Sequence, residues 1–177
     1  MATLEKALLG GGCFWCIEAV YNRVNGVHSA ISGYAGGARP NPSYEQICSG
    51  ATGHAEVVEI TYDTEVISYE EILDIFWVIH NPTTLNQQGA DRGTQYRSVI
   101  YYYDEQQQIE ARESIQKAQE SLDSPIVTEL SAAPEFFEAE EYHQDYFTSH
   151  PTQGYCYAVV GPKVEKFMSK FGDKVKK

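Results

Sequence analysis

The sequence predicts an α+β fold in which helices pack on a mixed β-sheet, with residues 1–177 forming a single domain. Strand-like and helix-like patterns alternate irregularly along the chain. Several of the strand patterns are apolar on both faces, which indicates strands that are covered on both sides. The chain shows neither an internal repeat nor a linker, and 177 residues are enough to bury one sizeable core.

The first part of the chain predicts a strand, a glycine turn and a helix. Residues 6–12, KALLGGG, are typical of a short strand that runs into a turn. From Cys13 the apolar period becomes helical, and we expect Gly26 to end the helix. Residues 27–37 predict a second strand, with glycines at positions where side chains would not fit. The buried face of the helix would consist of Ile17, Val20, Tyr21 and Val24.

A turn-rich stretch leads into a third strand. Residues 38–54 are rich in turn formers, and residues 44–48 could form one helical turn. Residues 55–63, AEVVEITYD, alternate in the manner of a strand. One face of this strand would carry Val58, Ile60 and Tyr62.

The next helix has clear start and stop signals. Ser68 and Glu71 have the spacing of a capping box, and Pro82 is expected to stop the helix. Residues 81–96 then form a long polar loop, and loops of that length in compact domains are often functional. Residues 97–103, RSVIYYY, predict a strong strand. The buried stripe of the helix would be Ile72, Ile75, Phe76 and Ile79.

The last third of the chain predicts one more long helix and several short elements. Asp104 is expected to cap a helix. Residues 126–130 predict a strand, residues 136–147 are helical in pattern, and residues 154–160 predict a short extended piece. The apolar side of the helix after Asp104 would carry Ala111, Ile115, Ala118 and Leu122.

The charge of the chain excludes several function classes. The net charge is −12, whereas a nucleic-acid-binding protein needs a basic face to meet phosphates. The Lys-rich stretch at residues 161–177 is short, and we expect it to be solvated. No apolar run approaches the length that spans a bilayer, and the N-terminal residues lack the pattern of a signal peptide. We therefore expect a cytoplasmic protein that binds neither nucleic acid nor membrane.

Residues 10–16, GGGCFWC, indicate a reactive thiol. Cys13 stands where the helix begins, and the partial positive charge of a helix N-terminus favours the nucleophilic thiolate. The preceding glycines would let another molecule approach the sulfur closely. Phe14 and Trp15 would supply an apolar wall that suits a small hydrophobic group of the substrate. The spacing therefore predicts a cysteine nucleophile next to an apolar pocket.

Three other interpretations of this cysteine remain open from the residues alone. Cys13 could be a structural cysteine in a buried turn. Cys13 and Cys16 could form a thioredoxin-like dithiol, although such motifs have a spacer of small residues and Phe-Trp is bulky. Zinc binding is a third possibility, because His54 and Glu56 match the His-x-Glu of zinc deaminases. The order of the motifs is reversed here and no proline precedes the first cysteine, which disfavours zinc.

His143 allows two further alternatives. Glu140-x-x-His143 resembles half of a di-iron motif, but the sequence contains no second copy. A hydrolase that pairs Cys13 with His143 is the other alternative, and ester substrates would acylate such an enzyme. A histidine that serves as a hydrogen-bond partner is the simpler interpretation of His143.

Taken together, the motifs of the chain resemble those of the methionine sulfoxide reductase A family. The matching segments occur in the family's order from about residue 9 to residue 156. The resemblance implies an α/β roll with a mixed sheet. It also implies reduction of the S-epimer of methionine sulfoxide, free or protein-bound, to methionine. The segments are GGCFWCIEA, GYAGG, SYEQICSGATGHAEVVEI, FWVIHNPTTLNQQGADRGTQYRS and FFEAEEYHQDYF.

The resemblance implies a role for each residue that matches the family's site. The loop at residues 86–91 reads Asn-Gln-Gln-Gly-Ala-Asp, so it departs from the family's Asn-Arg-Gln-Gly-Asn-Asp at Gln87 and Ala90 and leaves Asp91 in place. The implied set comprises Cys13 as nucleophile, Phe14 and Trp15 as the wall for the sulfoxide methyl, Glu56 as the proton donor, Tyr44 and Tyr96 as hydroxyls on the sulfoxide oxygen, and Asp91 and His143 as polar lining.

The implied chemistry needs a protonated acid and a second thiol. A sulfoxide oxygen leaves poorly until it is protonated, so Glu56 should have a raised pKa from burial beside aromatic residues. The sulfenic acid formed on Cys13 would condense with Cys156, or with Cys16 one helical turn away, and Cys48 is expected to be inert. Thioredoxin or a similar dithiol would restore the enzyme. We expect no metal or organic cofactor and a monomeric protein.

Overall fold

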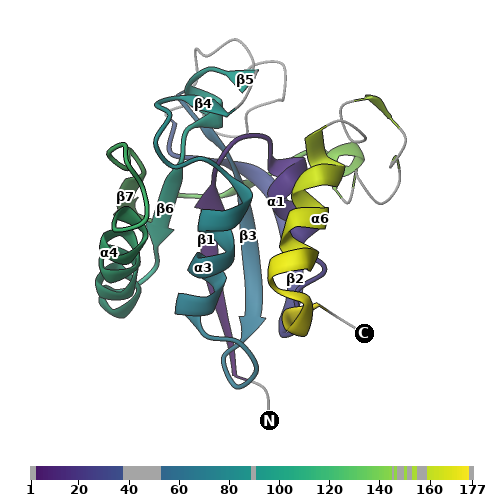
Figure 1. Ribbon diagram of the computed structural model, residues 1–177. Coiled ribbons are helices and arrows are strands. Elements are labelled where there is room, and N and C mark those ends of the chain that lie inside the picture. Colours follow the sequence, from purple (N-terminus) through teal and green to yellow (C-terminus); the bar gives the residue numbers. More distant parts are fainter. Residues whose placement is uncertain are drawn as a thin grey trace.

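A mixed β-sheet forms the frame of the molecule (Figure 1). The computed structural model describes residues 3–37, 53–88, 91–144, 146, 150, 153–154 and 159–175. In these residues six strands are ordered β7-β6-β1-β3-β2-β8. Strands β6 and β7 are parallel, and the other neighbours are antiparallel. The strands are β1 (Leu4–Gly10), β2 (Val27–Ala35), β3 (Ala55–Asp63), β6 (Val99–Tyr102), β7 (Glu129–Ala132) and β8 (Phe137–Glu138).

Helices cover one face of this sheet. Figure 1 shows α3 crossing in front of β1 and β3, with α4 on one side of it and α6 on the other. Helix α1 packs on β2 and β3 and against α6. None of the described helices is long and apolar enough to cross a membrane. The helices are α1 (Phe14–Tyr21), α3 (Tyr69–Ile79), α4 (Glu105–Gln119) and α6 (Gly161–Lys170), with short 3₁₀ turns at Thr94–Tyr96, Glu141–His143 and Gly172–Lys174.

The predicted α+β architecture with a mixed sheet is confirmed. Strand β3 and helix α3 lie where the patterns placed them, and the capping box of Ser68 and Glu71 is formed. Asp104 caps α4 by accepting a hydrogen bond from the backbone N–H of Gln107 at 2.8 Å. The four residues predicted to form the stripe of α3 are all buried. These elements could be predicted because their apolar periods and caps are local signals.

Helix α1 is shorter than predicted. It ends at Tyr21, with Asn22 as its C-cap, although the apolar period continues to Val24. Val24 instead forms an isolated β-bridge with Val175, and the backbone N–H of Asn25 donates to the carbonyl oxygen of Lys174 at 2.6 Å. Pairing with the chain's own C-terminal segment therefore takes these residues out of the helix.

The polar stretch at residues 81–96 contains regular structure that the sequence analysis did not predict. Residues Gln87–Gln88 and Asp91–Arg92 form the two short antiparallel strands β4 and β5. The Gln88 side chain also accepts a hydrogen bond from the backbone N–H of Asn81 at 2.8 Å. The Gln88 side chain thus provides the hydrogen-bond partner that another strand would provide for this backbone N–H in a regular sheet.

The helix predicted at residues 136–147 is wrong for residues 136–144. Phe137–Glu138 form strand β8 at the edge of β2, and Glu141–His143 form a single 3₁₀ turn. The Gln144 side chain holds this segment against β2, because it accepts from the backbone N–H of Ser32 at 2.9 Å and donates to the Ser32 carbonyl at 2.8 Å. Edge pairing and this amide clamp override a pattern that is helical in sequence.

Two further expectations about the end of the chain need correction. Strand β7 begins at Glu129, whereas the sequence placed it at residues 126–130, and the backbone N–H of Val127 donates instead to the Pro82 carbonyl. The Lys-rich stretch is not simply solvated, because α6 buries Val164 and Phe167 in the core. Most of residues 154–160, and the turn expected at residues 44–48, lie outside the described residues.

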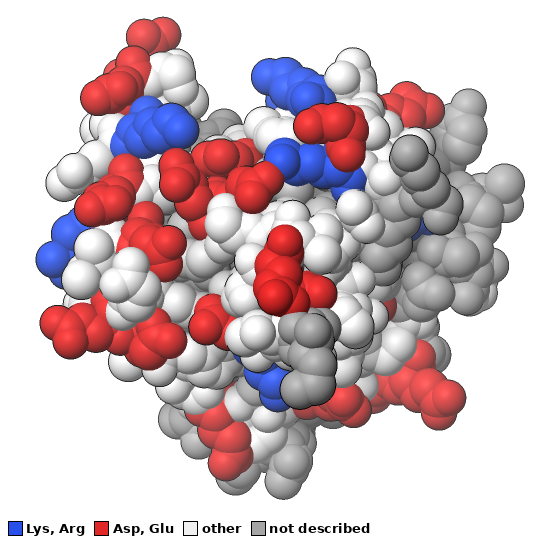
Figure 2. Space-filling model, turned by 90° about the horizontal axis from the view of Figure 1, so that it is seen from below, with Lys and Arg blue, Asp and Glu red and all other residues white. Residues whose placement is uncertain are grey.

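Acidic side chains dominate one end of the molecule. Figure 2, which views the molecule from below, shows many more Asp and Glu than Lys and Arg on that face. The predominance agrees with the net charge of −12. Such a face repels nucleic acid phosphates.

Candidate active site

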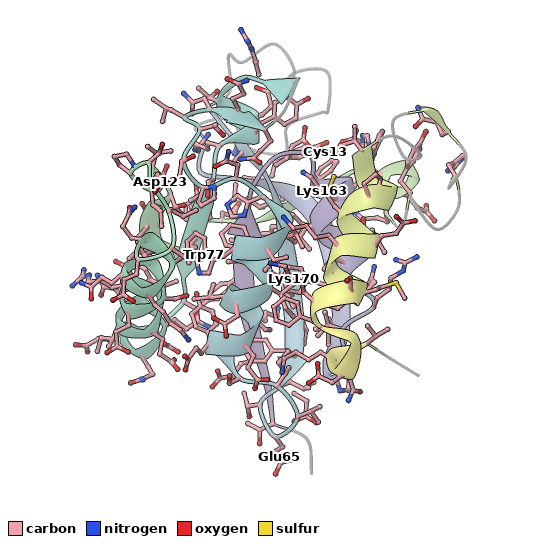
Figure 3. All side chains as sticks on the ribbon, viewed as in Figure 1. Cys13, Glu65, Trp77, Asp123, Lys163 and Lys170 are labelled. Carbon is pink, nitrogen blue, oxygen red and sulfur yellow. The ribbon has the colours of Figure 1, made fainter. Side chains whose placement is uncertain are left out.

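The first turn of α1 carries the cysteine that the sequence singled out (Figure 3). Cys13 is the N-cap of α1, with φ −67° and ψ 129°, and its side chain is 9% exposed. Strand β1 ends three residues earlier at Gly10, so the chain passes from the centre of the sheet into the helix through two glycines. The thiol therefore lies at a helix N-terminus, where partial positive charge favours an anion.

The three glycines before Cys13 are required by the protein's own packing. A Cβ atom at Gly10 would lie 2.8 Å from the carbonyl oxygen of Glu56, and one at Gly11 would lie 2.8 Å from the His80 ring. Gly12 has a φ of 86°, and a Cβ there would lie 2.8 Å from the Gln88 side chain. The sequence analysis attributed these glycines to the approach of another molecule, but in the structure the space is filled by the protein itself.

Glu56 brings a carboxyl group to the start of α1. The side chain comes from β3, is 0% exposed, and accepts a hydrogen bond from the backbone N–H of Phe14 at 3.2 Å. Phe14 directly follows Cys13, so the carboxyl is hydrogen-bonded to the helix turn that the thiol begins. Glu56 is therefore not an ordinary solvated residue of the strand.

An aromatic cluster lies beside this turn. Phe14 is fully buried, with ring centroids 5.2 Å from His143 and 5.6 Å from Tyr34. Trp15 stacks on Tyr146 at 4.0 Å with an interplanar angle of 8°. The Trp15 indole N–H donates a hydrogen bond to Nδ1 of His143 at 3.1 Å. His143 and Tyr146 thus pack against the two aromatic residues that follow the thiol.

His143 acts on this cluster as a hydrogen-bond acceptor. Because Nδ1 accepts from Trp15, the neutral ring has its proton on Nε2, which lies 3.6 Å from a Glu140 carboxylate oxygen. The other Glu140 oxygen accepts from the Tyr34 hydroxyl at 3.2 Å. Burial lowers the pKa of His143, and nearby Glu140 opposes that effect only in part. The ring can therefore stay neutral and keep the acceptor that Trp15 needs.

The sequence analysis did not assign Tyr34, Glu140 or Tyr146 to the site. Glu140 was noticed for its i, i+3 spacing from His143, and this spacing does mark a pair, although in a 3₁₀ turn and not a helix. The two tyrosines gave no signal, because aromatic residues are common in cores and contacts across more than 100 residues leave no local pattern.

The other predicted site residues are less well defined by the structure. The Tyr96 carbonyl accepts from the backbone N–H of Gly12 at 3.1 Å, and its side chain is half-buried. Asp91 pairs with Gln88 in the β4–β5 hairpin, but its side chain lies outside the described part of the chain, as do Tyr44, Cys48 and Cys156. Cys16 is 1% exposed and lies one turn into α1.

His54, the histidine of the possible zinc motif, is buried just before β3. Its side chain is 1% exposed, and Nδ1 accepts a hydrogen bond from the backbone N–H of Gly37 at 3.0 Å. The edge of its ring faces Phe137, with centroids 5.6 Å apart. His54 therefore joins the ends of β2 and β3 to the β8 segment.

A second buried histidine supports the glycine turn from behind. His80 stacks on Phe76 at 3.9 Å, and its Nδ1–H donates to the Phe76 carbonyl at 2.6 Å. Nε2 must then accept from the hydroxyl of Ser98 at 2.7 Å, and Ser98 in turn accepts from Thr128 at 2.8 Å. Burial lowers the pKa of His80 to about 3, so the ring against Gly11 stays neutral at ordinary pH.

These features define a class: an α+β protein with a thiol at a helix N-terminus, a buried carboxyl on the same turn and an aromatic wall beside both. The family described as "Peptide methionine sulfoxide reductase" matches residues 5–175. The peptide methionine sulfoxide reductase MsrA of Polynucleobacter asymbioticus is 59% identical over 97% of this chain and 91% of its own length. The chain therefore belongs to the peptide methionine sulfoxide reductase family, and it is an oxidoreductase.

Solved structures agree with this assignment. The reduced form of Mxr1 from Saccharomyces cerevisiae superposes with a TM-score of 0.80 at 34% identity, covering 86% of this chain and 89% of that one. Mxr1 in complex with Trx2 superposes with a TM-score of 0.57 at 25% identity, covering 81% and 84%. Methionine sulfoxide reductase A of Corynebacterium diphtheriae superposes with a TM-score of 0.81 at 35% identity, covering 85% of this chain and 76% of that one, so the fold is shared with a methionine sulfoxide reductase.

The neutral His80 predicts a specific dependence of stability on pH. The folded-state pKa of about 3 lies below the unfolded value near 6.5, so the unfolded state binds a proton first as the pH falls. Because of His80, the free energy of unfolding should therefore fall by about 2 kcal/mol as the pH is lowered from 7 to 5. Urea unfolding across this range should show that His80→Gln removes this part of the slope.

Ser98→Ala provides the matched control for this measurement. It removes the hydroxyl that Nε2 uses but keeps the titrating ring, so it should lower stability at every pH and retain the slope. An unchanged slope in His80→Gln would contradict the assignment of a neutral buried ring.

Proposed function

We propose that this chain reduces the S-epimer of methionine sulfoxide, free or protein-bound, to methionine and so repairs oxidised proteins. The observation that supports the proposal is the hydrogen bond from the Phe14 N–H to the buried Glu56, because Phe14 directly follows Cys13. Family membership gives the reaction, and this geometry supports an assignment of roles to the residues.

Cys13 is the proposed nucleophile. Its position at the N-terminus of α1 favours the thiolate, and the aromatic residues beside it keep bulk water away. The thiolate attacks the sulfoxide sulfur, which gains two electrons, while the cysteine sulfur loses two. The oxygen and a proton end on Cys13 as a sulfenic acid, and methionine leaves.

Glu56 is the proposed proton donor. Complete burial disfavours a charged carboxylate, whereas the N–H of Phe14 at 3.2 Å favours it. Burial therefore favours the protonated carboxyl, and we propose that Glu56 transfers this proton to the sulfoxide oxygen.

The aromatic cluster is the proposed pocket for the methyl group of the substrate. Trp15 is fixed in two directions, by stacking on Tyr146 and by its hydrogen bond to His143, so it forms a rigid wall. Tyr44 and Tyr96 are proposed to bind the sulfoxide oxygen, and Asp91 to line the site with His143. The methyl group and the oxygen of the sulfoxide would then have separate sites on opposite sides of the chiral sulfur. Such a pocket binds only one of the two epimers.

The sulfenic acid is proposed to be resolved within the same chain. A second thiol attacks the Cys13 sulfur, an S–S bond forms, the S–O bond breaks, and the thiol proton leaves with the hydroxyl group as water. We favour Cys156 on the family resemblance and keep Cys16, one helical turn from Cys13, as the second candidate. Thioredoxin is the proposed reductant of the disulfide, supported by the complex of the related Mxr1 with Trx2.

The wider context of the reaction is also proposed. Residues 1–177 would form one catalytic domain that works as a monomer in the cytoplasm, without a metal or organic cofactor. The acidic surface supports the absence of nucleic acid partners. Nothing in the proposed electron flow from thioredoxin to Cys13 to the sulfoxide requires another redox group.

The proposed reaction can be tested with racemic N-acetyl-methionine sulfoxide and dithiothreitol, with the epimers resolved by chiral chromatography. We expect only the S-epimer to be consumed. Cys13→Ser should abolish turnover without loss of the fold, because a hydroxyl is too weakly acidic to replace a thiolate. Consumption of both epimers at equal rates, or near-normal activity of Cys13→Ser, would overturn the proposal.

Glu56→Gln should slow the sulfoxide reduction step by about a hundredfold or more, because the amide keeps the shape but cannot donate the proton. Single-turnover kinetics of sulfenic acid formation would measure this step. Glu59→Gln is the matched control, since Glu59 lies on the same strand and pairs with Lys6 at the surface. A similar loss in both variants would show that Glu56 is not the acid.

The resolving thiol can be identified with single Cys→Ser variants treated with excess sulfoxide in the absence of reductant. Cys156→Ser should stall as a sulfenic acid that dimedone traps, whereas Cys16→Ser should form the disulfide. Counting free thiols and adding thioredoxin would distinguish the two. Normal recycling by both variants would contradict a single resolving cysteine.

A further inference from the structure

A long groove between α3 and α6 is not used by the proposed chemistry. Its wider part has a volume of about 610 Å³, and a second hollow of about 310 Å³ shares Trp77, Val78 and Lys166 with it. Half-buried Trp77 and the apolar residues Pro82 and Val159 form much of the floor. A floor of this kind can pack against the backbone and stems of an extended peptide.

Three lysines of α6 line this groove. Lys163, Lys166 and Lys170 stand at i, i+3 and i+7, and therefore on one face of the helix. Within the described residues none of the three makes a hydrogen bond or an ion pair, unlike Lys117, which pairs with Glu70 at 3.7 Å. In a chain of net charge −12, three uncompensated cations on one face form a local reversal of the surface charge.

The acidic residues of the groove do not cancel these lysines. Asp123 is exposed at the rim of the wider part, and Asp74 lines the smaller hollow. Burial raises the pKa of Asp74, and the cations that act on its charge are Lys117 and Lys174. The charges on the α6 side of the groove therefore remain available to a ligand.

The groove reaches the segment that backs the cysteine. His80 and Gln88 line its wider part, and these two side chains are also the ones packed against Gly11 and Gly12. Lys163 is close enough to His80 for its charge to contribute to the lowered pKa of that ring. Figure 3 shows Lys163 at the end of α6 nearer Cys13, and Lys170 further along the same helix.

We propose that this groove binds an acidic segment of the oxidised polypeptide, next in sequence to the methionine sulfoxide held at Cys13. The inference rests on the proposed function and names a class of its substrates. From Lys163 to Lys170 the helix rises by about 10 Å, which an extended peptide spans in about three residues. Two or three Asp or Glu side chains in a row would therefore meet the lysines.

The charge of the whole molecule explains why such a groove is useful. A surface of net charge −12 repels acidic polypeptides, so their sulfoxides would reach Cys13 slowly without a local attraction. Lysines beside the site make the local surface charge positive where an acidic polypeptide would dock. The contribution is electrostatic and exposed, so it must weaken as salt is added.

Peptides of equal length with one central methionine sulfoxide test the inference, with dithiothreitol as reductant. One set carries Asp-Asp-Asp on either side of the sulfoxide at varied spacing, and the matched set carries Asn-Asn-Asn. At low ionic strength we expect the best Asp peptide to have a KM about three- to tenfold lower than its Asn counterpart, with kcat unchanged. The difference should disappear in about 0.5 M salt.

Variants of the protein separate the groove from a general charge effect. Lys163→Gln/Lys166→Gln should remove the difference between the two peptides and leave turnover of N-acetyl-methionine sulfoxide unchanged. Lys6→Gln/Arg112→Gln changes the net charge equally at exposed positions of β1 and α4, and it should retain the difference.

The outcomes that overturn the inference are distinct from failure of the proposed function. Equal KM values for Asp and Asn peptides in the unmodified protein would refute the acidic segment. If the control variant lost the KM difference between the Asp and Asn peptides as fully as the lysine variant, the effect would come from net charge and not from the groove. If the lysine variant turned over more slowly only when thioredoxin replaced dithiothreitol, the groove would bind the reductant and not the substrate. Failure to reduce N-acetyl-methionine sulfoxide would instead reject the proposed function itself, and the inference with it.

Discussion

The hydrogen bond between the Phe14 backbone N–H and the buried Glu56 carboxyl is the contact on which the arrangement of the site depends. It joins the first turn of α1 to β3, a neighbour of β1 in the sheet. The N–H would otherwise be one of the unsatisfied donors at a helix start, and the carboxyl would be a buried group without that donor. A single contact thereby fixes where the helix begins and brings Cys13 and an acid to the same turn.

The close packing of the glycine turn reinforces this contact. Gly10, Gly11 and Gly12 each meet another element at a distance that leaves no room for a Cβ atom. Behind them the neutral His80 is held by backbone and hydroxyl partners, so the ring is a fixed surface and not a mobile charge. The position of the thiol is therefore defined by the core as well as by the helix.

The side of the site away from β1 is built by a segment from the far end of the chain. Gln144 binds the backbone of Ser32 on β2, and the adjacent His143 accepts the indole proton of Trp15. Tyr146 stacks on one face of that indole. Because one amide clamp and one histidine position the whole wall, the geometry around the proposed methyl pocket is coupled to the edge of the sheet.

The sequence by itself determined the elements that carry local signals: the mixed α+β class, the capping box at Ser68, the start of α1 at Cys13 and the candidate set around GGGCFWC. Periodicity and caps are written into neighbouring residues, so they can be read without the fold. Only the tertiary structure decided that Glu56 is buried against Phe14, that Phe137–Glu138 form an edge strand and Glu141–His143 a 3₁₀ turn where the sequence predicts a helix, and that the glycines serve internal packing. The tertiary structure also decided that the Lys-rich stretch contains helix α6, which lines the groove between α3 and α6. These features depend on contacts between residues far apart in the chain, whose energies exceed the local preferences and leave no periodic trace in the sequence.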